Sequence, residues 1–233
     1  MSGRCVVICS GGLDSTTVAA HARYVEGREP ILLHFQYSCQ AETKEVEAVR
    51  NIAGALGAEA RFCDVDWLRA IGGSTLTAAD GPIAGAIEGA EFPYEWVPAR
   101  NLVFMANAAA LCDALGIGEI YMGLNLEESA VYPDNTIEFF ERLGDLLQVS
   151  TLVRPVVKMP VARMMKWQIV KYAYEIGAPI HLSWSCYRNG PLHCGACGPC
   201  YMRRTAHAML GRKDSIRYLS DQPGRDAKLV AAG

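Results

Sequence analysis

The chain opens on a short run of branched residues that leads directly into a turn of glycine and serine. Arg4 to Cys9 reads R-C-V-V-I-C and is followed by Ser10-Gly11-Gly12. An apolar run of this length predicts a buried strand, and Ser15 to Val25 beyond the turn predicts a helix. A strand, a tight turn and a helix in this order are typical of the first unit of a parallel α/β sheet.

The alternation of strands and helices continues along the chain, which predicts a doubly wound parallel sheet. Further strands are expected at Pro30 to Tyr37, Glu59 to Asp64, Glu119 to Gly123 and Leu152 to Val157. Further helices are expected at Glu42 to Leu56, which Gly57 closes, Asn101 to Leu115, Thr136 to Gln148 and Val161 to Ile176.

Between Ala70 and Trp96 the pattern lapses into small residues and proline, which indicates a long surface loop or lid. We expect a single domain over residues 1–233, because 233 residues suit one domain with a sizeable core.

Composition excludes several classes of protein. The chain is 51% hydrophobic and 20% charged, which is ordinary for a soluble globular protein. Its net charge of −3 supplies no basic field for a nucleic-acid backbone, so no direct nucleic-acid partner is expected. No apolar run reaches the roughly 20 residues that span a bilayer. The apolar run near the start of the chain is too short for the core of a signal peptide. We therefore expect a cytoplasmic protein without membrane contact.

The segment Ser10-Gly11-Gly12-Leu13-Asp14-Ser15 carries the clearest binding chemistry. Its glycines let backbone amides approach an anion, its serines add hydroxyl donors, and the following helix offers unpaired N–H groups. Pyrophosphate is the natural guest, and Asp14 beside it indicates either Mg²⁺ or a helix cap. The plain alternative is an ordinary turn between strand and helix. The segment is neither a Walker loop nor a G-x-G-x-x-G dinucleotide fingerprint.

The nine cysteines fall into two groups. Cys5, Cys9, Cys39, Cys63 and Cys112 are scattered in apolar or helical contexts, where they are expected as small buried hydrophobes. The other four give C-x7-C-x2-C-x2-C, a spacing that lets four thiolates complete a structural tetrahedral Zn²⁺ site. A redox pair and a contribution from His193 are the alternatives. The predicted zinc loop is 186–200, with ligands Cys186, Cys194, Cys197 and Cys200.

The segment S-G-G-L-D-S resembles the PP-loop of the ATP pyrophosphatases, enzymes with an adenine nucleotide alpha-hydrolase-like fold that release pyrophosphate while adenylating a carbonyl oxygen. Together with the cysteine cluster it resembles the QueC, or 7-cyano-7-deazaguanine synthase, family from Val6 to about Leu210. Further similar segments are Val97-Pro98-Ala99-Arg100-Asn101, Tyr132-Pro133-Asp134, Lys166-Trp167-Gln168-Ile169 and Arg203.

The resemblance implies an ATP-dependent ligase that forms a C–N bond. The carboxylate of 7-carboxy-7-deazaguanine would attack ATP, ammonia would convert the acyl adenylate to an amide, and a second adenylation would give the nitrile. Asp14, Ser15, Lys166 and Arg100 are the implied catalytic residues, with ATP and Mg²⁺ held at Ser10 to Ser15. The substrate would contact Arg100, Asn101, Tyr132 and Asp134. Arg100 could clamp a phosphate or carboxylate, while Asn101 and Asp134 could instead serve as helix or turn caps. Relatives in this family imply a homodimer.

Several segments depart from the family pattern. The family usually has Gly-Gln-x-His after the tyrosine, whereas Tyr37 is followed by Ser38-Cys39-Gln40-Ala41. In addition, Ala99 replaces a glycine, Asn135-Thr136 replaces Cys-Arg, and Gln168 replaces a glutamate. These departures suggest a changed acceptor or second step. One alternative is a QueC-like ligase of an antiphage defence system that joins the activated acid to a protein amine. Another is a non-catalytic nucleotide-binding protein.

Overall fold

Five strands form one parallel sheet in the order β3-β2-β1-β4-β5. The computed structural model describes residues 3–78, 83, 95–130 and 132–219. The strands are β1 (Arg4–Ile8), β2 (Glu29–Gln36), β3 (Glu59–Asp64), β4 (Glu119–Tyr121) and β5 (Val156–Lys158). The connections run from β1 to one edge and then, from β4, to the other. The sheet is therefore doubly wound, as predicted, and its switch point lies between β1 and β4.

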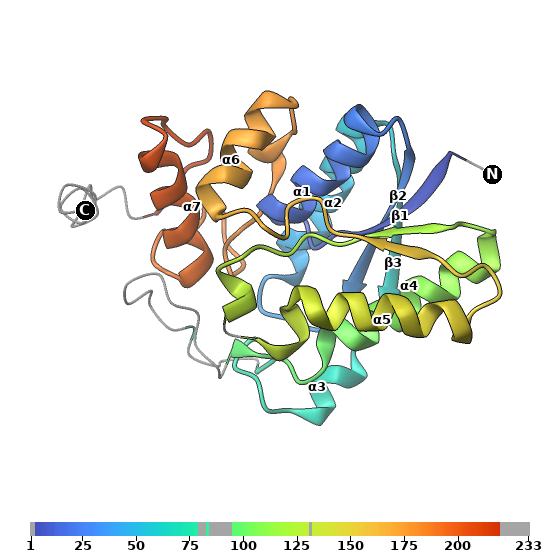
Figure 1. The fold of residues 1–233 in the computed structure, drawn as a ribbon. Helices are drawn as coiled ribbons and strands as arrows, with labels where there is room; N and C mark the ends of the chain where they lie inside the picture. The colour runs from blue at the N-terminus through green and yellow to red at the C-terminus, as the bar shows by residue number, and fades with distance from the viewer. Residues whose placement is uncertain (1–2, 79–82, 84–94, 131, 220–233) are drawn as a thin grey trace.

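Helices cover both faces of the sheet (Figure 1). One face carries α1 (Leu13–Ala20), α2 (Glu42–Leu56) and α6 (Lys166–Glu175), and the other carries α4 (Arg100–Leu115) and α5 (Ile137–Ser150). Helix α7 (Gly198–Met209) packs beside α6, and α3 (Trp67–Ile71) follows β3. The short helical segments are the π-helix η1 (His21–Val25) and the 3-10 helices η3 (Glu128–Ala130), η4 (Pro133–Asn135) and η5 (Ile180–Leu182).

The apolar side chains of β1 alternate between these two layers. Val6 and Ile8 pack with α4 and α5, whereas Cys5 and Val7 pack with α1, α2 and α6. Burial on both faces accounts for the uninterrupted apolar run that marked this strand in the sequence. Four of the scattered cysteines are buried and Cys63 is partly buried. Burial raises the pKa of Cys5 and of Cys112 to about 12, so these thiols stay protonated at neutral pH.

Two sequence-based boundaries were wrong. The strand expected from Leu152 begins only at Val156, because the N–H groups of Leu152 and Val153 donate to the carboxylate of Asp113 at 3.1 and 2.8 Å instead of to a strand. The helix expected from Val161 begins at Lys166, and the residues before it form turns in which Ala162 N donates to Met159 O at 3.2 Å.

Other segments extend or limit the prediction. The helix expected from Ser15 starts at Leu13, and beyond Ala20 it widens into the π-helix η1. Helix α7 was not predicted. Residues 79–82 and 84–94 of the expected loop between Ala70 and Trp96 lie outside the described residues. Within the part of the chain that is described, no helix is long and apolar enough to cross a membrane.

The residue before α4 adopts a backbone conformation that favours glycine. Ala99, where the resembled family has Gly, has φ +53 and ψ +24. We expect Ala99→Gly to raise the free energy of unfolding by roughly 1 kcal/mol, because it removes the steric cost of a side chain in the left-handed region. Urea denaturation would measure the change. Ala110→Gly, on an exposed position within α4, is the matched control and should lower stability by about 1 kcal/mol. A loss of stability in both variants would contradict the prediction.

Candidate active site

The loop between β1 and α1 lies at the carboxyl end of the sheet, at the switch point. Gly11 has φ +80, and a Cβ there would lie 3.0 Å from the backbone oxygen of Glu45. Gly11 is therefore required both for its conformation and for the close approach of α2. Ser10 Oγ accepts the N–H of Gly12 at 3.3 Å and lies 3.2 Å from Ser15 Oγ. The Ser10 hydroxyl thus links the loop to the start of α1.

The residues directly after β4 pack closely against the start of α1. A Cβ at Gly123 would lie 2.9 Å from both the Cα and the N of Ser15, so a side chain would displace the backbone there. The sequence placed Gly123 at the end of a strand and at the start of a segment that resembles the family. The structure shows that it lets two parallel strands bring their ends together at the loop.

Asp14 belongs to a buried ionic cluster. Its Oδ2 accepts hydrogen bonds from Lys166 Nζ at 2.6 Å and from Asn125 Nδ2 at 2.7 Å. The same two donors reach Glu128 Oε1, at 3.3 and 2.6 Å. Asn135 Nδ2 donates to Glu128 Oε2 at 3.2 Å. One lysine therefore serves two carboxylates, one from the loop and one from η3.

The electrostatics of this cluster suit a divalent cation. Burial raises the pKa of Asp14 above its ordinary value, and the ammonium of Lys166 opposes that effect. Burial acts in the same direction on Glu128, but Lys166 and the amide donors outweigh it and lower the pKa. Within the described chain Asp14 Oδ1 is buried without a hydrogen-bond partner. Two carboxylates with a free, hard oxygen acceptor match the ligand preference of Mg²⁺.

Arg100, the first residue of α4, is held by aromatic residues. Its Nη1 donates to the hydroxyl of Tyr37 at 3.2 Å, and its guanidinium lies 5.7 Å from the Tyr37 ring and 6.0 Å from the Phe104 ring. The aromatic rings hold the planar group in place through cation–π contacts. Arg100 thus presents a fixed positive charge to the cavity.

Asn101 and Asp134 bind each other. The backbone N–H of Asn101 donates to Asp134 Oδ2 at 3.1 Å, and Asn101 Nδ2 donates to Asp134 O at 2.8 Å. Asp134 therefore caps the first turn of α4 from a distant segment, whereas the sequence had offered it as a turn or cap residue for the helix that directly follows it. Asn101 itself lies within α4 and is not its cap.

One cavity of about 190 Å³ brings most of the predicted residues together. Those that line it are Ser10, Gly12, Leu13, Asp14, Ser15, Arg100, Asn101, Tyr132, Asp134 and Lys166. Gly11 is not among them, and the four cysteines lie elsewhere. Sequence reasoning missed lining residues that include His34, Glu45, Glu95, Trp96, Glu128, Asn135, Trp184 and Tyr187. The position of His34 near the carboxyl end of β2 was a signal that could have found it.

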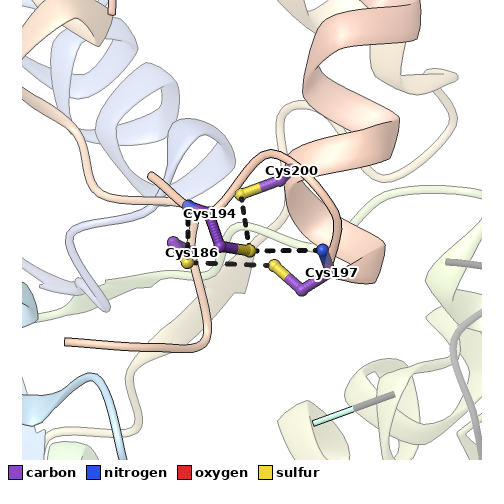
Figure 2. A group of neighbouring side chains, drawn as sticks. All are labelled: Cys186, Cys194, Cys197 and Cys200. Atoms are coloured by element: carbon purple, nitrogen blue, oxygen red, sulfur yellow. Dashed lines mark hydrogen bonds between the residues drawn. The ribbon is translucent and has the colours of Figure 1, made fainter. Parts of the chain in front are cut away.

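The four clustered cysteines converge as the spacing predicted (Figure 2). Their sulfur atoms all lie within 4.8 Å of one another, with 4.0 Å between Cys194 and Cys200 and between Cys186 and Cys197. Tetrahedral sulfurs on Zn–S bonds of about 2.3 Å would be about 3.8 Å apart. The N–H of Cys197 donates to Cys194 Sγ at 3.3 Å, as does that of Ala196 at 3.4 Å. Such donors stabilise thiolates, so the cluster could bind zinc.

Two neighbouring residues serve the packing of this region. His193 Nε2 accepts the N–H of Ser185 at 3.0 Å, and its ring lies 4.1 Å from that of Trp184, so it is engaged away from the sulfur cluster. Arg203 is 1% exposed and donates to Asp214 Oδ2 at 2.7 Å and to Ser183 Oγ at 2.6 Å. Arg203 thereby joins α7 to the segment that follows α6.

The doubly wound sheet with this loop at its switch point defines a PP-loop α/β protein. Residues 4–211 match the family model described as "Queuosine biosynthesis protein QueC". The chain belongs to the QueC family.

Named relatives agree with this assignment. A protein named 7-cyano-7-deazaguanine synthase from Saccharolobus solfataricus is 48% identical over 220 residues, which cover 92% of this chain and 47% of that protein. The chain spans about half the length of this relative and of two other curated relatives of similar identity. A protein of the same name from Methanothrix thermoacetophila is 41% identical over 93% of this chain and 99% of its own length. The solved structure of NMN synthetase from Francisella tularensis, at 14% identity over 91% of this chain and 78% of that one, has a TM-score of 0.46, too low to carry an argument.

The shared lysine of the ionic cluster makes a stability prediction. Lys166→Met should lower the free energy of unfolding by roughly 3 kcal/mol, because it leaves two buried carboxylates without their cation. Lys171→Met on the same helix is the matched control, since the exposed Lys171 only pairs with Glu175 at 3.8 Å. It should change stability by less than about 0.5 kcal/mol. Urea denaturation would measure both, and equal small losses would show that the carboxylates do not depend on Lys166.

Proposed function

We propose that the chain adenylates the carboxylate of 7-carboxy-7-deazaguanine with ATP, converts the product to the amide, and dehydrates the amide to 7-cyano-7-deazaguanine. The observation that carries the proposal is the single cavity that joins the PP-loop, the ionic cluster of Asp14 and the Arg100 wall. The names of the relatives supply the substrate class and favour this reaction over the antiphage ligase.

The residues have complementary roles in the proposed adenylation. The backbone and hydroxyls of Ser10 to Ser15 hold the phosphates, and Lys166 neutralises charge on the departing pyrophosphate. Asp14 and Glu128 would hold Mg²⁺, which supplies further neutralisation of phosphate charge when bound. Arg100 orients the substrate carboxylate for in-line attack on the α-phosphorus. Asn101, Tyr132 and Asp134 remain predicted substrate contacts, with the first and last fixing the wall through their mutual hydrogen bonds.

The departures from the family pattern have local structural roles. Gln168 Oε1 accepts the N–H of Met165 at 2.8 Å and so caps α6, as a glutamate there could. Thr136 Oγ1 accepts the N–H of Phe139 at 3.1 Å and caps α5. Asn135 binds Glu128. These substitutions therefore do not require a changed acceptor, and ammonia is the proposed amine.

The reaction is tested with the purified chain, 7-carboxy-7-deazaguanine, ATP, Mg²⁺ and ammonia. We expect mass spectrometry to detect the nitrile together with AMP and pyrophosphate. Asp14→Asn should lower the rate at least about 100-fold, because it removes a proposed carboxylate ligand of the Mg²⁺ that neutralises phosphate charge. Asp145→Asn, on the exposed side of α5, is the control and should leave the rate unchanged. An adenylate that waits for a protein amine would favour the antiphage ligase, and absence of pyrophosphate release would favour the non-catalytic reading.

We further propose that Cys186, Cys194, Cys197 and Cys200 hold one structural zinc ion. Cys197→Ser should abolish stoichiometric zinc and lower the melting temperature, because the loop loses the metal that joins its ends. Zinc would be measured by atomic absorption on the purified chain. Cys63→Ser, outside the cluster, should retain one zinc per chain. Full zinc content in Cys197→Ser would contradict the assignment.

A further inference from the structure

Glu45 occupies a position in the cavity that the adenylation step does not use. It lies in the first turn of α2, and its backbone oxygen would be 3.0 Å from a Cβ at Gly11, so it adjoins the phosphate loop directly. Its side chain lines the same cavity as Ser10 and Lys166. A ligand whose phosphate rests on the loop therefore has Glu45 as a neighbour.

The carboxylate of Glu45 keeps its basic oxygens available. Within the described residues its hydrogen-bond donor is the thiol of Cys39, at 3.6 Å from Oε2, and a thiol is a weak donor. Three other carboxylates of the cavity are held by stronger donors. Asp14 and Glu128 share Lys166, and Asp134 accepts the N–H of Asn101.

We propose that Glu45 is the base that takes a proton from the amine as it attacks the activated carboxylate. This inference rests on the proposed function. The nitrogen of the amine forms a bond to the acyl carbon, one of its protons passes to the carboxylate of Glu45, and the bond from that carbon to the phosphate oxygen breaks. AMP leaves with the electron pair, and Glu45 then returns the proton to solvent.

The charges around Glu45 support this role. Burial raises the pKa of Glu45 from 4.5 to about 7, against the opposing charge of Arg100 and with a smaller contribution from Glu42 in the same direction. The neighbouring Cys39 and Tyr37 have pKa values raised well above their ordinary range, so both stay neutral. Burial also raises the pKa of Cys9 to about 11, with a small contribution from the charge of Glu45 in the same direction. A base with a pKa near the working pH is the most effective in proton transfer.

His34 is a second candidate base in the cavity. Its Nδ1 lies 2.9 Å from the backbone oxygen of Cys9, so that nitrogen carries the proton. Burial lowers the pKa of His34, which makes it a weaker base than Glu45. Its ring is 1% exposed and packs edge-on against Phe62.

The test separates adenylation from amine transfer in Glu45→Gln. Exchange of labelled pyrophosphate into ATP, driven by the substrate acid, should stay within about threefold of wild type. Transfer to hydroxylamine, which is unprotonated near neutral pH, should fall at least about 100-fold, the usual contribution of a general base. Glu47→Gln is the matched control, because Glu47 lies on the same helix with its side chain 58% exposed.

The pH profile gives a second readout. Because the base must be ionised, the wild-type transfer rate should rise with pH up to about 7 and then level, and Glu45→Gln should lose this rise. Formate should restore part of the transfer rate to Glu45→Ala. A preserved pH rise in Glu45→Gln, or transfer within threefold of wild type, would overturn the proposal for Glu45 alone. Absence of pyrophosphate exchange in the wild-type chain would overturn the proposed function and this inference with it.

Thermal stability tests the burial without any activity. Between pH 4.5 and about 7 the folded chain holds a proton on Glu45 that the unfolded chain has lost, so ionisation of Glu45 lowers stability as pH rises. Glu45→Gln should therefore melt at a higher temperature than wild type at pH 8, by a margin that shrinks toward pH 5. A margin independent of pH would show that Glu45 does not titrate in this range and would overturn its role as the base.

Discussion

Two carboxylates that share one lysine hold the centre of this molecule together, one buried and one partly buried. Asp14 comes from the first turn of α1, Glu128 from the turn after β4, and Lys166 from the start of α6. Burying a charge is costly unless an opposite charge compensates it. The charges on these three segments can therefore be buried favourably only when the segments come together. Within the described chain, the arrangement leaves one oxygen of Asp14 without a hydrogen-bond donor, beside the loop that is proposed to receive phosphates. The cluster that stabilises the fold would therefore also hold the proposed divalent cation.

The cavity depends on a second set of contacts between distant segments. Asp134 caps α4 at Asn101, and this cap fixes the helix start that carries Arg100. On the other side, Gly11 lets α2 approach, which brings Glu45 to the loop. Arg100 and Glu45 then line a single cavity. In the proposed reaction, the acid would be activated and the amine would lose its proton there without movement between separate sites.

The zinc region and the site are joined through packing. Arg203 of α7 binds the residues after α6, and Trp184 in that segment donates its N–H to Gly11 O at 2.8 Å. The thiolate cluster thus supports a segment that contacts the phosphate loop while its own sulfurs stay outside the cavity. This arrangement is consistent with a structural metal and explains why Arg203, a match to the family pattern, is almost entirely buried.

The sequence by itself determined the sheet class, most helix and strand positions, the tight turn between β1 and α1, and the convergence of the four cysteines. These features depend on local periodicity, short spacing and turn chemistry, which a few neighbouring residues specify. It did not reveal that β5 begins at Val156 and not at Leu152, where the N–H groups donate to Asp113. It also did not reveal the partner of Asp134. It gave no sign that Glu45 enters the cavity, and it placed Lys166 and Asp14 in one site only through the family resemblance, without showing that they form an ion pair across 152 positions. Only the tertiary structure decided these, because burial and charge pairing depend on residues that folding brings together from across the whole chain.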